Sequence, residues 1–303
     1  MNRHLVASIT GLLAAILLTL PVYAQDLGIV ATTTIIGDVV QQVAGTLVSV
    51  RVLFPPDADP HGFQPTPMDV IAISSADTVF VHGASLETGI EDLLSSAAGS
   101  VVTLTEGQPL RFLGQDHAEE DGHARGDADP HVWFDPTYVM VWTRRIEETL
   151  TQLCPEYTDA FKRNASAYRA RLAELDLWIW GEVARIPREQ RRLVTDHRVL
   201  GYFAARYGFD QIGAVLPTFS TLVEPSAKEL ANLEEAIRSL SIPAIFVGTT
   251  VNPVLAESIA ADTGVAIVKL HTGSLSEAGG PADTYLDLMR HDVTAIVSAL
   301  ETP

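Results

Sequence analysis

Short apolar runs rich in Val, Ile and Phe alternate along this chain with longer amphipathic stretches. The runs that we expect to be strands are 28–33, 48–54, 77–83, 100–105, 191–197, 212–217, 243–249 and 265–270. Helix-like stretches such as 34–45 and 226–240 separate most of them. Short buried runs that alternate with helices are typical of parallel sheets built from βαβ units. The pattern therefore predicts an α/β fold with two lobes, each a four-stranded parallel sheet flanked by helices.

A long helix is expected between the two sets of strands. Residues 155–186 contain no proline after Pro155, which suits a first helical turn, and Pro187 follows directly. Apolar residues recur there at three- and four-residue spacing, and the helix would span on the order of 45 Å at about 1.5 Å per residue. We therefore expect an N-terminal lobe over 25–154, a stiff connecting helix over 155–186 and a C-terminal lobe over 187–303.

The first 24 residues have the pattern of a secretory signal peptide. Arg3 precedes an apolar run from Leu5 to Leu20, Pro21 closes the run, and Ala24 completes a small-residue cleavage site. A membrane anchor is the weaker interpretation because the run is shorter than the ~20 residues that span a bilayer. No cysteine lies near the cleavage site, so we expect a periplasmic protein without a lipid anchor.

Composition narrows the range of partners. The chain carries 20 Lys and Arg against 38 Asp and Glu, for a formal net charge of −18. Such a chain repels nucleic acid and anionic lipid and favours cationic partners, although a solvated acidic surface explains much of the charge. Cys154 is the single cysteine, so no intramolecular disulfide can form and the core must hold the fold.

One segment, residues 114–130, is acidic, contains His117 and His123, and lacks the apolar residues of a core. Its composition predicts a solvated surface loop. Weak collection of metal cations by its histidines and carboxylates is a second, compositional possibility.

The pentapeptide DADPH occurs twice, at 57–61 and at 127–131, and each copy ends in a histidine. The chain has nine histidines, and five of them follow or end expected strands or follow the acidic loop: His61, His82, His131, His197 and His271. Ligands of open parallel sheets bind beyond the carboxyl ends of the strands. One histidine at such a place is usually a packed or capping residue, but several from both lobes favour a shared metal site.

Acidic neighbours accompany these histidines. A metal-binding imidazole needs its second nitrogen held by a carboxylate or a carbonyl. The aspartates available for that role are Asp57, Asp59, Asp129 and Asp196, and the pattern leaves open which of them act. Pro60 and Pro130 restrict the residues before them to extended conformations, which fixes how the following histidine is presented.

The stretches FPPDADPHGFQPTPMDV, DPHVWFDP, DHRVLGYFAARYGFD and GGPADTYLDLMRHDV resemble the cluster A-I group of periplasmic solute receptors. These are the zinc- and manganese-binding subunits of ABC importers, and the similarity covers nearly the whole chain after the signal. The resemblance implies two α/β lobes joined by one rigid helix, with a metal held between them. It places three metal ligands on His61, His131 and His197.

The resemblance also shows one departure. The family usually has an aspartate ligand after the last strand of the second lobe, where this chain has Gly273. Water, His271, Glu277 or another carboxylate is left to complete the shell. Manganese-binding relatives tend to carry a carboxylate at the position of His197, so the resemblance favours zinc here.

The leading hypothesis is a receptor that captures Zn²⁺ as transported ligand and passes it to an ABC permease with its ATPase, as a monomer. A periplasmic zinc metallochaperone is a further partner that the hypothesis leaves open, and no nucleic-acid partner is expected. A manganese or iron receptor of the same family is the alternative. A zinc hydrolase or lyase also fits three histidines with an open position, but the chain has neither an HExxH motif nor a nucleophile elbow.

Overall fold

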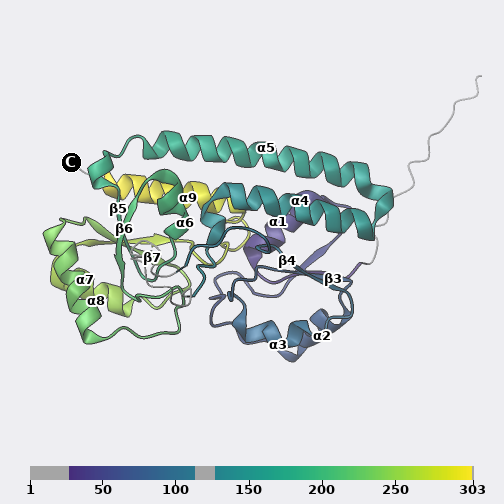
Figure 1. The fold of residues 1–303 in the computed structure, drawn as a ribbon, viewed down its shortest axis with the longest axis horizontal. Coiled ribbons are helices and arrows are strands. Elements are labelled where there is room, and N and C mark those ends of the chain that lie inside the picture. Colours follow the sequence, from purple (N-terminus) through teal and green to yellow (C-terminus); the bar gives the residue numbers. More distant parts are fainter. Residues whose placement is uncertain (1–26, 113–126, 302–303) are drawn as a thin grey trace, which may run out of the picture.

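The fold consists of two lobes, each built on its own parallel sheet, and a long helix that runs along both (Figure 1). A computed structural model describes residues 27–112 and 127–301. The first sheet has the order β2-β1-β3-β4, from β1 (Ile29–Ala31), β2 (Val50–Val52), β3 (Thr78–Val81) and β4 (Ser100–Thr103). The second has the order β6-β5-β7-β8, from β5 (Arg192–Thr195), β6 (Asp210–Ala214), β7 (Ala244–Gly248) and β8 (Ala266–Leu270). All pairings are parallel, which confirms the α/β prediction.

Helices flank the sheets, and several of them begin at residues that cap a helix N-terminus. They are α1 (Thr34–Ala44), α2 (Pro67–Ser75), α3 (Glu91–Leu94), α4 (Pro136–Leu153), α5 (Thr158–Val183), α6 (Gly201–Tyr207), α7 (Ala227–Ser239), α8 (Val254–Thr263) and α9 (Tyr285–Leu300). Asp135 caps α4 by accepting from the amide of Thr137, with proline at the first helical position. Ser226 and Glu229 form a capping box on α7.

The connecting helix α5 has 26 residues and follows a 3₁₀ turn at Pro155–Tyr157. Its buried residues are Phe161, Ala165, Tyr168, Leu172, Leu175, Ile179 and Val183. The first six belong to the apolar series expected from the sequence, which also included Tyr157 of the preceding 3₁₀ turn. This face packs on α1, α4 and α9, so α5 contacts elements of both lobes. In Figure 1 the helix runs along one side of both lobes.

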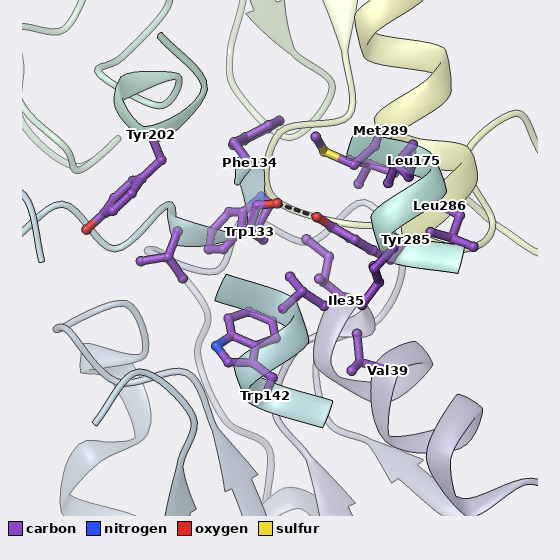
Figure 2. Close-up of a cluster of buried hydrophobic side chains, with 14 of the residues drawn as sticks. Ile35, Val39, Trp133, Phe134, Trp142, Leu175, Tyr202, Tyr285, Leu286 and Met289 are labelled. Carbon is purple, nitrogen blue, oxygen red and sulfur yellow. Dashed lines mark hydrogen bonds between the residues drawn. The ribbon is translucent and has the colours of Figure 1, made fainter. Parts of the chain in front are cut away.

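The two lobes share one hydrophobic core. Ile35 and Trp142 from the first lobe, Leu175 from α5 and Met289 from α9 all belong to the same buried cluster (Figure 2). The hydroxyl of Tyr285 donates to the carbonyl of Trp133 at 2.6 Å, which joins α9 to the first lobe. Because this core is continuous, we expect the lobes to move little against each other. The residue limits of the two lobes and the connecting helix remain a prediction.

Two sequence-based expectations concern segments at the edge of the structure. The signal peptide and residues 113–126 of the acidic loop lie outside the described residues. The end of that loop differs from the expectation of a solvated segment, because Ala128 pairs with Phe112 in an antiparallel bridge and Asp129 is 1% exposed. The carboxylate of Asp129 is buried because it serves a neighbouring imidazole, described below. None of the helices in residues 27–112 and 127–301 is long and apolar enough to cross a membrane.

Candidate metal centre

Three histidines from distant parts of the chain meet between the two lobes. His61 follows β2, His131 precedes a 3₁₀ turn at Val132–Phe134, and His197 lies two residues after β5. Their ligand atoms all lie within 4.8 Å of one another, and all three residues are buried. The Nε2 of His131 is 3.1 Å from that of His61 and 3.3 Å from that of His197. The two copies of DADPH therefore contribute to one cluster.

Two of these imidazoles each have an aspartate that fixes which ring nitrogen carries the proton. The Nδ1 of His131 lies 2.8 Å from Asp129 Oδ1, and the Nδ1 of His197 lies 2.8 Å from Asp196 Oδ1. An imidazole nitrogen that faces a carboxylate oxygen carries the proton and donates it. In both rings the Nε2 atom is then unprotonated and turns its lone pair toward the other ring.

This arrangement fits a divalent cation. Two unprotonated Nε2 atoms at 3.3 Å cannot hydrogen-bond to each other, so their lone pairs repel unless a positive charge lies between them. Nitrogen ligands about 2.05 Å from a tetrahedral zinc are about 3.3 Å apart. The separations of 3.1 and 3.3 Å agree with that geometry.

Burial keeps the imidazoles of His61 and His131 neutral at ordinary pH. Burial, assisted by the nearby imidazole of His197, lowers the pKa of His61 to about 3. The pKa of His131 is held well below its usual value by burial and by the nearby imidazoles of His197, His61 and His82. Metal ligation requires the neutral form of histidine. These two ligands are therefore ready to bind metal without first losing a proton.

The expected fourth-ligand position lies beside the cluster and offers no side chain. A Cβ built on Gly273 would lie 2.9 Å from Cδ of Pro60 and 3.2 Å from Oγ1 of Thr250. The backbone φ of Gly273 is outside the left-handed region. Gly273 thus leaves room for the proline that precedes His61. Within the described residues, no carboxylate joins the three-histidine group.

The other candidate residues lie elsewhere. The amide of His271 donates to Asp292 Oδ1 at 2.9 Å, and its ring packs edge-on against His291. Glu277 is exposed, and neither it nor His271 belongs to the described three-histidine group. His82 is buried against the rings of Trp133 and Trp142.

The four candidate aspartates have different roles. Asp129 and Asp196 hold imidazoles, as described above. Asp59 instead accepts the backbone N–H of His61 with Oδ1 and the hydroxyl of Thr221 with Oδ2. Asp57 is exposed, and its backbone N–H donates to Ser274. The sequence carried no signal for Thr221, because it lies in an irregular segment with no metal-binding side chain.

The comparisons with known proteins agree with the fold and the site. Residues 29–299 match the family model described as the periplasmic component A of the zinc-uptake complex. The manganese-binding lipoprotein MntA of Halalkalibacterium halodurans is 32% identical over 281 residues, which cover 91% of this chain and 89% of that protein. The iron-binding protein YfeA of Yersinia pestis is 30% identical over 90% of this chain and 86% of its own length.

Solved structures show the same architecture. The periplasmic zinc-binding protein TroA from Treponema pallidum superimposes with a TM-score of 0.81 at 30% identity, over 90% of this chain and 98% of that one. The Mn-bound periplasmic metal-binding protein from candidatus liberibacter asiaticus gives a TM-score of 0.78 at 28% identity, with the same coverage.

Two parallel-sheet lobes on one long helix, with a buried cluster of imidazoles between them, define a metal-binding solute receptor. The chain belongs to the family of periplasmic component A proteins of zinc-uptake complexes. Members of this family bind and hand over a solute and are not enzymes, so the hydrolase alternative is set aside.

Proposed function

We propose that this protein is an extracytoplasmic receptor that binds one Zn²⁺ ion through His61, His131 and His197 and delivers it to an ABC importer. The observation that carries the choice of zinc is the donor set: three imidazoles lie within 4.8 Å of one another, and no carboxylate joins them among the described residues. Imidazole suits zinc, whereas carboxylate and water oxygens suit manganese. Zinc is generally four-coordinate, so a water molecule would complete the shell.

A manganese or iron receptor is the second candidate, and the names of several curated relatives support it. Relatives that match nine-tenths of the chain are named as manganese-binding or iron-binding proteins. Those names describe the relatives' ligands, and the donor set of this chain supports zinc. The family description, and the name of a relative from Streptococcus anginosus, the manganese ABC transporter substrate-binding lipoprotein PsaA, support delivery to the permease and ATPase of an ABC transporter. The leader pattern at 1–24 supports a periplasmic protein, and we propose that it acts there as a monomer.

The test is a competition experiment on purified, metal-stripped protein. We expect one Zn²⁺ per chain, with an affinity at least tenfold above that for Mn²⁺ and Fe²⁺ in matched titrations under anaerobic conditions; a factor of ten corresponds to about 1.4 kcal/mol. Equal or tighter binding of Mn²⁺ would select the second candidate. A stoichiometry unchanged in a triple His→Ala variant would contradict the ligand assignment.

A further inference from the structure

One hydrogen-bonded chain links a histidine of the metal centre to the opposite lobe. Asp59 Oδ1 accepts from the backbone N–H of His61 at 3.0 Å. Its other oxygen, Oδ2, accepts from the hydroxyl of Thr221 at 2.5 Å, across 162 residues of sequence. A single carboxylate thus holds a metal ligand of the N-terminal lobe with one oxygen and a loop of the C-terminal lobe with the other.

His61 differs from the other two histidines in how it is held. His131 and His197 are each fixed by a carboxylate on the imidazole itself, at Nδ1. The Nδ1 of His61 has no carboxylate partner among the described residues, and the residue is fixed through its backbone instead. Its ring orientation therefore depends on the position of the segment that carries it. His61 is also the most exposed of the three, at 7%.

The segment that carries His61 packs between two loops of the C-terminal lobe. Pro60 lies against Gly273, close enough that a Cβ on Gly273 would be 2.9 Å from the proline ring. A Cβ on Gly62 would be 3.5 Å from Leu222, the residue that follows Thr221. Contacts on both sides of His61 thus depend on the C-terminal lobe. The backbone N–H of Asp57 also donates to Ser274 of that lobe, but Asp59–Thr221 is the bond whose carboxylate also holds the backbone of His61.

The loop that carries Thr221 is loosely packed, which favours local opening. Leu222 and Val223 are 64% and 46% exposed, so little packing holds this part of the loop. An open groove of about 650 Å³ lies beside it and is lined by Asp59, Thr221 and Leu222, among others. Low packing and an exposed backbone are features of segments that open locally.

We propose that Asp59 is a positioning residue and that its bond to Thr221 sets the rate at which the metal leaves the site. This proposal rests on the proposed function. When the bond is made, the segment Asp59–His61 is closed against the C-terminal lobe and the imidazole of His61 faces the other two. When it breaks, that segment separates from the loop and His61 is the first ligand released. His131 and His197 stay in place because their aspartates hold the rings.

The experiment measures zinc release from the full-length mature protein by stopped flow with an excess of a chromogenic chelator. Thr221→Val removes the hydroxyl and keeps the shape of the side chain. We expect release on the order of tenfold faster, since a hydrogen bond to a charged group contributes roughly 1.5 kcal/mol or more. Thr221→Ser retains the hydroxyl and should restore the wild-type rate. Asp59→Asn keeps an acceptor oxygen without the charge and should accelerate release less than Thr221→Val.

A matched control comes from the same loop. Thr218 donates its hydroxyl to the carbonyl of Ser220, a bond that stays within the C-terminal lobe. Thr218→Val should release zinc at the wild-type rate. Thermal unfolding of the metal-free variants separates a local effect from misfolding, and we expect Thr221→Val to melt within a few degrees of wild type.

The outcomes separate the two proposals. Release from Thr221→Val within twofold of wild type, with zinc binding intact, would overturn the role of the Asp59–Thr221 bond and leave the receptor function standing. Equal acceleration by Thr218→Val would also overturn it, because loop disruption alone would then explain the effect. Failure of the wild-type protein to bind any of the divalent metals would overturn both.

Discussion

His131 and His197 face each other across the lobe interface with their Nε2 atoms 3.3 Å apart, and each is oriented by its own aspartate. One of the pair comes from each lobe, so a cation between them bridges the lobes. The lobes are already joined by a continuous core and by α5. Metal binding is therefore expected to draw together a few loops at the site and to leave the arrangement of the sheets unchanged.

The first prediction concerns the aspartate that holds His131. Asp129→Asn keeps the size of the side chain but no longer fixes the imidazole tautomer, so zinc affinity should fall by roughly 10–100-fold. His131→Ala removes the ligand and should reduce affinity by more than that. Isothermal titration of the metal-stripped variants measures both. Asp57→Asn is the control, because Asp57 is exposed and its hydrogen bond to Ser274 uses the backbone N–H. Affinity that is unchanged in Asp129→Asn would contradict the assignment.

The second prediction is a change of metal preference at His197. His197→Glu replaces an imidazole nitrogen with a carboxylate oxygen, the donor that suits manganese. We expect the ratio of zinc to manganese affinity to fall by on the order of tenfold or more, about 1.4 kcal/mol. Competition titration with both metals measures the ratio directly. His197→Gln provides an oxygen donor of similar length without charge and should weaken both metals. An unchanged ratio in His197→Glu would argue that the fourth ligand, rather than His197, sets selectivity.

Much of the architecture followed from the hydrophobic pattern, because short buried strands and a long amphipathic helix have distinct periods. All eight strands overlap the expected runs, and the first six buried residues of α5 belong to the expected apolar series. The three histidines could be singled out because residues at the ends of parallel strands converge. The choice among five candidates, however, came from the family resemblance.

The remaining features of the site depend on how the lobes meet. The bond between Asp59 and Thr221 joins residues 162 positions apart. The DADPH repeat marks Asp59, but no local pattern marks Thr221 as its partner. Asp129 appeared to belong to a solvated acidic loop because its neighbours are polar, yet it is buried beside His131. A polar sequence does not reveal which of its carboxylates is matched to a buried donor.

The third prediction concerns pH and His82. This imidazole is buried in the N-terminal lobe, and burial lowers its pKa to about 3, opposed by a hydrogen bond to the carbonyl of Pro130. In the unfolded chain it titrates near 6.5, so between pH 6.5 and about 3 the unfolded state binds a proton that the folded state does not. The contribution of His82 to stability is therefore lost as the pH falls through this window, by up to about 1.4 kcal/mol per pH unit.

Replacing His82 by Asn, which keeps a donor near the position of Nδ1, removes this dependence. The metal-free variant should gain stability relative to wild type as the pH is lowered from 6.5 to 4, as measured by urea unfolding. His291→Asn should show no such gain between pH 6.5 and 4, but its stability relative to wild type should recover as the pH rises above 6.5, because the bond to Asp292 raises the pKa of His291. The stability that this residue contributes is present below pH 6.5 and is lost as the pH rises through the folded pKa. Parallel curves for wild type and His82→Asn would show that His82 titrates normally.

The last prediction compares two substitutions at Gly273. A Cβ at this position lies 2.9 Å from the ring of Pro60, so both Gly273→Ala and Gly273→Asp must displace the segment that carries His61. The backbone φ there does not require glycine, so the proline contact is the main obstacle. Gly273→Ala should weaken binding of zinc and manganese alike and lower the melting temperature.

Gly273→Asp causes the same steric clash with Pro60 but adds a carboxylate beside the three imidazoles. We expect it to bind metal more tightly than Gly273→Ala, by on the order of tenfold, with the larger gain for manganese because an oxygen donor is added. Because the two variants share the displacement of Pro60, their ratio isolates the carboxylate. Equal affinities in the two variants would show that a side chain at this position does not reach the metal.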